Sequence, residues 1–220
     1  MFVLTFVTAV SFPHGIRAKE EVVKLPEHDS TGSVTLEQAL SERRSVRAFQ
    51  DTPVDLETVS QLCWAAQGIS DKARQLRTAP SAGALYGLDT YIAVGNAHGL
   101  DAGLYRYEPG GHELLLQEHG DVRQAIAEAA LGQQWIADAP LVFLIVGVPE
   151  RLAYPYRDRA ERYTLLEAGH AAQNLALQAV ARELATTVVG AFSDSDLREL
   201  LGVPSSHIPL YVIPVGVPAQ

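Results

Sequence analysis

The segment APLVFLIVGV, residues 139–148, limits the fold more than any other part of the chain. It is apolar at nearly every position, whereas a strand with one face in water alternates polar and apolar residues. A strand without that alternation needs cover on both of its faces. We therefore predict that this segment is the central strand of a sheet that helices flank.

The longest predicted helix runs from about residue 162 to residue 184 and is apolar over more than one stripe of its surface. Its apolar positions are Leu165, Leu166, Ala168, Ala172, Leu175, Ala176, Ala179 and Val180. A helix with so wide an apolar surface is buried. We predict that it lies in the core of the domain and at a contact between subunits.

The remaining elements follow from capping residues, periodicity and turn residues. Helices are expected from Thr35 to about residue 43 and at residues 56–67, 121–131 and 193–201, with Gly68 as the stop of the second. Strands are expected at residues 88–95, 186–192 and 208–217, and a hairpin at residues 103–117. Helices and strands mix without a regular βαβ rhythm, which indicates the α+β class.

Length and composition narrow the class of protein further. The 220 residues suffice for one large domain. The formal net charge of −9 argues against a nucleic-acid-binding surface. Cys63 is the only cysteine, which excludes a disulfide within the chain, and its apolar neighbours indicate a core thiol. The seven histidines show no metal-binding spacing, and we predict no metal centre.

The N-terminal segment leaves two interpretations open. The apolar run at residues 2–12 has the length of the hydrophobic part of a signal peptide, and it is too short for a membrane span. Residues 1–18 are therefore either a signal peptide, with export to the periplasm, or an N-terminal extension of a cytoplasmic protein. Residues 19–33 are polar and predict an extended linker or arm before a domain at residues 34–220.

Arginines gather directly after the first predicted helix, in the segment RRSVR. Arg43, Arg44 and Arg47 lie beside the hydroxyl of Ser45. A planar guanidinium donates two parallel hydrogen bonds to a phosphate group, so this pattern is typical of an anion site. A solvated basic helix end is the alternative.

Small residues mark two further segments. In RTAPSAGALYG, residues 77–87, they let the backbone approach a flat ligand closely, and Gly190 could do the same at a strand end. An ordinary loop and a simple strand terminator are the alternatives. The chain has no GxGxxG opening a helix after a strand and no GxxxxGK[ST], which argues against the classical nucleotide-binding folds.

Taken in order, several segments resemble the nitroreductase family of flavoproteins, and within it the SagB-type branch of thiazole- and oxazole-forming oxidases. These segments are RRSVRAF, LCWAAQGI, RTAPSAGALYG, GLYRY, LGQQWIADAP, ERYTLLEAGHAAQNLALQA, VGAF and PLYVIPVG. The resemblance extends from about residue 34 to residue 217. It implies an α+β fold with a mixed or antiparallel central sheet, and a homodimer that binds two FMN molecules at its interface.

The resemblance also implies roles for individual residues. One group of cofactor-binding residues would consist of Arg43, Arg44, Ser45 and Arg47. Arg43 and Ser45 would hold the phosphate and ribityl end of FMN, and Arg47 would lie at the N1/C2 edge of the ring. A cation at that edge stabilises the reduced flavin. The other cofactor-binding residues would be Pro80, Ser81, Ala82 and Gly83 from the second subunit, Gln133 near the pyrimidine edge, and Gly190 and Ala191 near N5.

The chain departs from the branch at three places. Gly87 stands where the branch has proline, which predicts a looser loop. The C-terminal segment PVGVPAQ has no basic residue to reach the phosphate. Pro155 replaces the lysine of azoline-oxidising members, while Tyr156, a candidate catalytic residue, is kept. A lysine–tyrosine pair is a plausible general base, so its loss weakens the peptide-azole hypothesis.

Three functions are therefore compared. The first is an FMN-dependent oxidoreductase that moves a hydride from NAD(P)H to a small acceptor, such as a nitroaromatic or a quinone, with ping-pong kinetics. The second is a dehydrogenase that oxidises azolines in a modified peptide. The third is a non-catalytic flavin-binding homodimer. The sequence does not distinguish NADH from NADPH, or one acceptor from another.

Overall fold

The structure is a computed structural model that describes residues 21–219, so the segment predicted as a signal peptide or extension lies outside the described residues. Its centre is a seven-stranded sheet with the strand order β1-β8-β7-β5-β9-β11-β10. These strands are β1 (Val22–Lys24), β5 (Leu88–Val94), β7 (Gly103–Glu108), β8 (Glu113–His119), β9 (Leu141–Gly147), β10 (Ala185–Thr186) and β11 (Ile208–Gly216). All neighbouring pairs are antiparallel, which gives the predicted α+β class.

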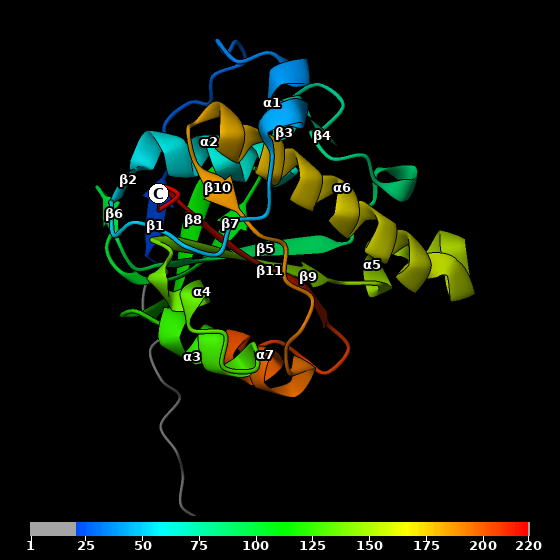
Figure 1. Ribbon diagram of the computed structural model, residues 1–220. Helices are drawn as coiled ribbons and strands as arrows, with labels where there is room; N and C mark the ends of the chain where they lie inside the picture. Colours follow the sequence, from blue (N-terminus) through cyan, green and yellow to red (C-terminus); the bar gives the residue numbers. More distant parts are fainter. Residues whose placement is uncertain (1–20, 220) are drawn as a thin grey trace, which may run out of the picture.

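Helices cover both faces of this sheet (Figure 1). One layer holds α1 (Leu36–Glu42), α2 (Leu56–Gln67) and α6 (Ala160–Ala181), and the opposite layer holds α3 (Arg123–Ala129), α4 (Trp135–Asp138) and α7 (Asp194–Leu201). Strand β9 lies between β5 and β11, and all of its residues are buried. The central, doubly covered strand predicted from APLVFLIVGV is therefore confirmed.

The helix boundaries show why these segments fold locally. The hydroxyl of Thr35 accepts from the Gln38 N–H and caps α1, and the Ser193 hydroxyl caps α7 in the same way. Gly68 ends α2 as predicted, but in an extended conformation at φ −69° instead of the left-handed one typical of helix ends. A Cβ there would lie 2.3 Å from the Trp64 Cδ1 atom, so the close contact requires glycine.

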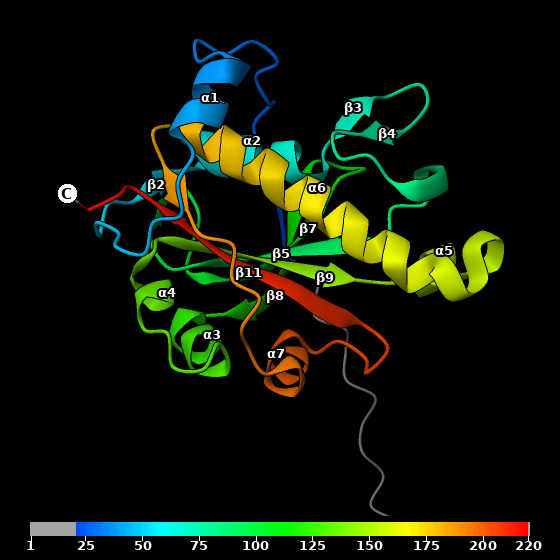
Figure 2. The same ribbon diagram turned by 45° about the vertical axis from the view of Figure 1, so that its right-hand side comes forward.

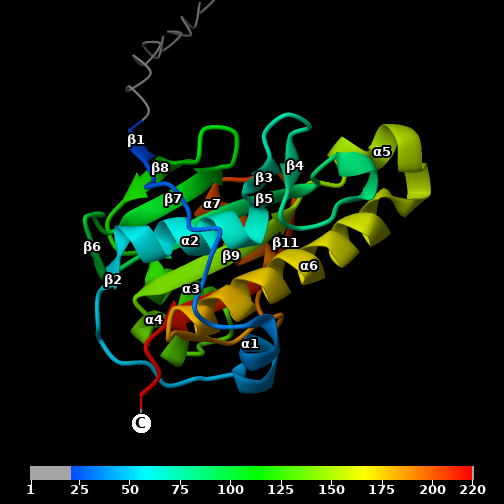
Figure 3. The same ribbon diagram turned by 90° about the horizontal axis from the view of Figure 1, so that it is seen from above.

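Helix α6 lies beside α2 over the sheet, and the two helices pack together (Figure 3). One side of α6 is buried, with Ala168, Ala171 and Leu175 in the main core. Leu165 and Leu166 are 45% and 54% exposed on the other side. Within one subunit the helix is therefore buried on one side only. Its outer side carries these two leucines together with exposed polar residues, which are Glu161, Arg162, His170 and Gln173.

Several elements differ from the sequence-based expectation. The strand expected at residues 186–192 is reduced to β10 and an isolated bridge between Val189 and Val212. Thr186 pairs with Val215 on one side and bridges Ser45 on the other, so the segment runs between β11 and the chain after α1. The predicted arm contributes β1, which pairs with the edge strand β8. An unexpected helix, α5 (Glu150–Tyr156), and the short η2 (Arg157–Arg159) precede α6.

The small elements lie at the margins of the fold. Strands β2 (Val54–Asp55) and β6 (Ala97–His98) form one pair, and β3 (Ile69–Asp71) and β4 (Leu76–Arg77) form another. The short helix η1 (Ala82–Ala84) lies before β5. Among residues 21–219, no helix is long and apolar enough to cross a membrane, and no cluster of metal-ligating side chains occurs.

Candidate functional site

The first part of the candidate site begins where α1 ends. We call it the arginine half-site and define it as Arg43, Arg44, Ser45, Arg47, Gln133, Gly190 and Ala191. The Arg43 N–H donates to the Ala39 carbonyl at 3.0 Å and caps α1. Arg43 and Arg44 line a cavity of about 300 Å³ together with Val180 on α6 and Thr186 of β10.

Arg43, Arg44 and Arg47 have no carboxylate within ion-pair distance in the described part of the chain, although Glu42 and Glu183 line the same cavity. Arg44 instead donates to main-chain carbonyls at 2.7 Å. Positive charges close together in sequence and without counter-charges attract an anion. The arrangement therefore favours an anionic ligand.

The other members of the arginine half-site lie on the loops beside α4. The Gln133 side-chain amide donates to the Ala191 carbonyl at 3.1 Å, so the structure brings these two residues together. The Arg47 guanidinium lies 5.7 Å from the centroid of the Trp135 ring. A Cβ at Gly190 would meet no atom within 4 Å, so the backbone there borders open space.

The second part of the candidate site is the loop between β4 and β5. We call it the loop half-site and define it as Pro80, Ser81, Ala82, Gly83 and Tyr156. Three of its members, Pro80, Ser81 and Ala82, line a cavity of about 260 Å³ against the first half of α6. Gly83 has a φ of +61°, a conformation that glycine adopts without strain.

Tyr156 lies against this loop. Its hydroxyl is 2.9 Å from the position that a Cβ at Gly83 would take, and its ring makes an edge contact with Tyr163 at a centroid distance of 4.9 Å. Pro155 precedes it in the last turn of α5. The structure thus places the candidate catalytic residue beside the segment predicted to line the flavin.

A buried carboxylate on α6 holds the loop half-site from behind. The Ser81 hydroxyl donates to Glu167 Oε2 at 2.6 Å and accepts from the Tyr86 N–H at 2.9 Å. Glu167 is 1% exposed, and burial raises the pKa of its carboxyl, while its hydrogen bonds oppose that shift. This network fixes the loop without any ligand.

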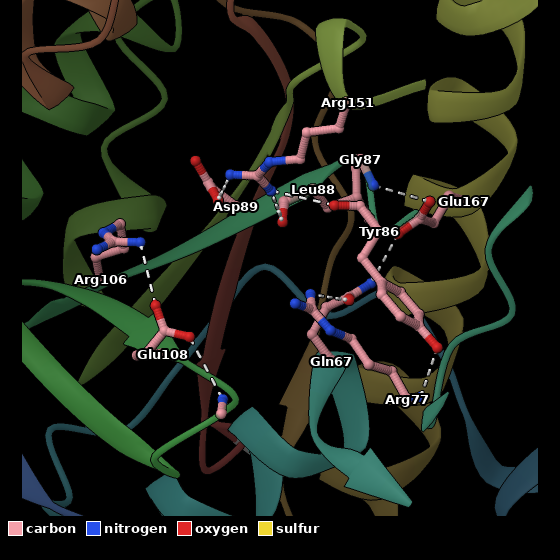
Figure 4. Close-up of polar contacts among 11 residues, drawn as sticks. Gln67, Arg77, Tyr86, Gly87, Leu88, Asp89, Arg106, Glu108, Arg151 and Glu167 are labelled. Carbon is pink, nitrogen blue, oxygen red and sulfur yellow. Dashed lines mark hydrogen bonds and ion pairs between the residues drawn. The ribbon is translucent and has the colours of Figure 1, made fainter. Parts of the chain in front are cut away.

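The Gly87 N–H joins the same network and donates to Glu167 Oε2 at 3.3 Å, as Figure 4 shows. Gly87 is buried, and a Cβ there would lie 2.5 Å from Leu152 Cδ1. The looser loop predicted from the missing proline is therefore wrong. A proline would remove this N–H, so glycine here makes the loop tighter.

Sequence reasoning missed Glu167, because it considered the apolar positions of this helix and did not ask which polar residues share their face. A signal was present, since Glu167 lies on the same face as Thr164, Ala168 and Ala171. A charged residue on a buried stripe is expected to have hydrogen-bonding partners.

The two half-sites lie toward opposite ends of α6. Tyr163 and Leu166 line the cavity of the loop half-site, whereas Ala176 and Val180 line that of the arginine half-site. Figure 2 shows α5 at one end of α6 and α1 near the other. The nearest lining residues of the two cavities along this helix are His170 and Ala176, six residues apart, which corresponds to about 9 Å along the axis. Among the described residues, no hydrogen bond or ion pair joins a member of one half-site to a member of the other.

These features define an α+β protein with an arginine-rich segment after its first helix and a small-residue loop before β5. Comparison with known proteins identifies the family to which the chain belongs. The model of the Nitroreductase family matches residues 40–217. The chain therefore belongs to the nitroreductase family of oxidoreductases.

Individual relatives agree with this assignment. A Methanocaldococcus jannaschii protein named as a nitroreductase is 39% identical over 194 residues, which cover 88% of this chain and 95% of the relative. A solved structure from Ralstonia eutropha JMP134, also named as a nitroreductase, is 31% identical with a TM-score of 0.81, and the match covers 91% of each chain.

A third comparison concerns the SagB-type branch. The Escherichia coli microcin synthetase complex McbBCD contains a chain with a TM-score of 0.72 and 24% identity. The match covers 98% of this chain and 85% of that one. At this identity the similarity shows a shared fold.

Proposed function

We propose that the protein is an FMN-dependent oxidoreductase that works as a homodimer, and that each FMN lies between the arginine half-site of one subunit and the loop half-site of the other. One observation carries the proposal. The two half-sites lie against different stretches of α6 in a single subunit, and Leu165 and Leu166 on the outer side of this helix are exposed. Pairing two subunits along α6 would cover Leu165 and Leu166 and bring opposite half-sites together.

The residues of the arginine half-site fit the anionic end of this cofactor. Arg43 and Ser45 would hold the phosphate and ribityl groups, with Arg44 adding positive charge. Arg47 would lie at the N1/C2 edge of the ring, where a fixed cation favours the reduced form. Because these guanidiniums lack carboxylate partners among residues 21–219, they can bind a phosphate without first breaking ion pairs.

The remaining groups fit the ring. The open space at Gly190 would let main-chain groups of Gly190 and Ala191 approach N5, and Gln133 would lie near the pyrimidine edge. The loop at residues 80–83 would cover one face and exclude water. Bound FMN would supply the redox chemistry, taking a hydride from NAD(P)H and passing it to an electron-poor acceptor such as a nitroaromatic or a quinone.

Three measurements on the purified protein test this function. A flavin absorbance spectrum that is bleached by NADH or NADPH without oxygen would support it, as would a dimer in analytical ultracentrifugation. With a quinone as acceptor, the double-reciprocal plots should be parallel. A protein that stays colourless after incubation with FMN would contradict the proposal and would favour a non-catalytic homodimer.

A second candidate function is the oxidation of azoline rings in a modified peptide, with Tyr156 as a catalytic residue. The contact between Tyr156 and Gly83 favours it, because the tyrosine lies beside the loop that would line the flavin. Pro155, which stands where the lysine of azoline-oxidising enzymes is expected, opposes it. If the protein aromatises a thiazoline peptide as fast as it reduces a quinone, this second function replaces the first.

A further inference from the structure

A second polar cavity lies outside both half-sites, where strands β5 and β7 separate. Their ladder ends at the pair Tyr91–Arg106, although β5 begins earlier, at Leu88, and β7 continues to Glu108. A cavity of about 230 Å³ lies at this opening, between residues 88–90 and residues 107–109. Strands that part in this way leave room for a ligand inside the sheet layer.

Three arginines from three different elements surround the opening (Figure 4). Arg151 of α5 pairs with Asp89 at 2.7 Å and also donates to two main-chain carbonyls. Arg106 of β7 lies 3.6 Å from a Glu108 carboxylate oxygen. Two of the three charges are therefore already balanced by a carboxylate.

Arg77, at the end of β4, is the exception. Its guanidinium lies 4.4 Å from the centroid of the Tyr86 ring and donates to the neutral Gln67 side chain at 2.9 Å. No carboxylate lies within ion-pair distance of it in the described part of the chain. Burial lowers the pKa of Arg77, because a cation removed from water is costly, and the nearby carboxyl group of Glu167 opposes that shift.

The nearest candidate counter-ion is already engaged elsewhere. Glu167 accepts from Ser81 and Gly87 through one carboxylate oxygen and from Gln67, at 3.5 Å, through the other. Gln67 thus stands between Glu167 and Arg77. The same chain of contacts links the cavity to the loop half-site.

Unpartnered buried atoms point to the same place. Three buried side-chain atoms lack a hydrogen-bonding partner among the described residues: Arg77 Nε, Thr90 Oγ1 and His207 Nδ1. The first two belong to residues that line this cavity. Thr90 is 2% exposed, and Leu88 and Ile92, which share its face of β5, are in the main core. Buried polar atoms are rarely left without a partner. A ligand that accepts hydrogen bonds would supply the missing partner for these two side chains.

We propose that this cavity is a binding site for a small monocarboxylate, held by the Arg77 guanidinium and the Thr90 hydroxyl. A carboxylate accepts hydrogen bonds from both groups, and its single charge matches the one unbalanced arginine. The site is independent of the proposed flavin chemistry, because neither Arg77 nor Thr90 belongs to a half-site.

An NMR titration of the ¹⁵N-labelled protein with acetate tests the proposal, with acetamide as an uncharged ligand of nearly the same shape. Acetate should cause saturable shifts of the amides near Thr90 and of the Arg77 Nε–H signal, and acetamide should cause none. Thr90→Val, which keeps the side-chain shape, should weaken acetate binding by about tenfold, and Arg77→Gln should remove it. Arg74→Gln makes the same charge change on an exposed part of the hairpin and should leave the affinity unchanged.

Several results would overturn the proposal. Equal shifts with acetamide, or acetate shifts near Thr90 that persist in Thr90→Val, would show that neither the charge nor the hydroxyl is recognised. Tighter binding of inorganic phosphate than of acetate at this cavity would contradict the single balancing charge. If Arg77→Gln does not fold, Thr90→Val decides the outcome. Acetate bound only at residues 43–47 would contradict this proposal and leave the proposed flavin site untouched.

Discussion

The two half-sites are stabilised in opposite ways. In the loop half-site, Ser81 and Gly87 are tied to the buried Glu167, and Gly83 lies against Tyr156. In the arginine half-site, the Arg44 guanidinium donates to main-chain carbonyls and the Arg47 guanidinium lies over the Trp135 ring, and none of the three arginines has a carboxylate partner among residues 21–219. The loop half-site is therefore ordered by contacts within the protein, whereas the arginine half-site would be neutralised only by a bound anion. Mutations in the first should therefore change protein stability, and mutations in the second should change ligand affinity.

The largest expected effect is on the preorganised half. Glu167→Leu leaves the Ser81 hydroxyl and the Gly87 N–H without their buried acceptor, which should lower the free energy of unfolding by about 2–3 kcal/mol. Urea denaturation of the FMN-free protein measures it. Glu161→Leu, an exposed position on the same helix, should change stability by less than about 0.5 kcal/mol. Equal effects of the two variants would show that the buried network does not stabilise the loop.

Arg43→Gln should have the reverse effect, weakening FMN binding while leaving the stability of the protein nearly unchanged. Loss of one charge-assisted contact to phosphate should raise the dissociation constant of FMN by about 10- to 30-fold, measured by flavin fluorescence titration. The unfolding free energy of the FMN-free protein should stay within about 0.5 kcal/mol of wild type. If Arg43→Gln loses stability but binds FMN normally, Arg43 stabilises the fold and does not bind the cofactor.

Arg47→Gln tests whether Arg43 and Arg47 of the arginine half-site contact different parts of the flavin. If Arg47 lies at the N1/C2 edge of the ring, removing its charge should lower the reduction potential of the bound flavin, by about 30 mV for a loss of 1.4 kcal/mol. Spectroelectrochemistry of the FMN-loaded protein measures the change. Arg43→Gln, at saturating FMN, serves as the control and should shift the potential less. An unchanged potential in Arg47→Gln would remove Arg47 from the ring.

The smallest expected effect is a pH dependence of stability that belongs to the loop half-site alone. Burial raises the pKa of Glu167, so the folded protein keeps this proton at pH values where the unfolded chain has released it. Stability from this group is complete at low pH and is lost as the pH rises through the folded-state pKa. Glu167→Gln should remove that loss, so its unfolding free energy should fall less than that of wild type as the pH rises from 5 to about 8. Parallel curves for the two proteins would contradict the role of burial.

Local rules in the sequence predicted much of the fold. Capping by Thr35, the apolar run that became β9, and the wide apolar surface of α6 depend on residues close together in the chain. The failures involve partners that are distant in sequence. The segment expected as a strand at residues 186–192 contacts Ser45 through Thr186, and β1 forms by pairing with β8.

The site followed the same pattern. Residue types left an anion site at Arg43 and an ordinary helix end both open, and the family resemblance predicted the binding roles of Arg43 and of residues 80–83. The contact of Gln133 with Ala191 spans 58 positions, and that of Ser81 with Glu167 spans 86. Only the fold brings such pairs together. The tightness of the loop at Gly87 likewise depends on Glu167 and Leu152, which no local pattern connects to it.

The central claim is that each flavin site combines the arginine half-site of one subunit with the loop half-site of the other. A mixed dimer tests it most directly, with Arg43→Glu in one chain and Ala82→Trp in the other, after each variant homodimer has been shown to lose tight FMN binding. If the sites are shared, both substitutions fall in one site and the other is intact, so the mixed dimer should bind one FMN with wild-type affinity. If each site lies within a single chain, both sites are damaged and no tight binding occurs, which would contradict the account.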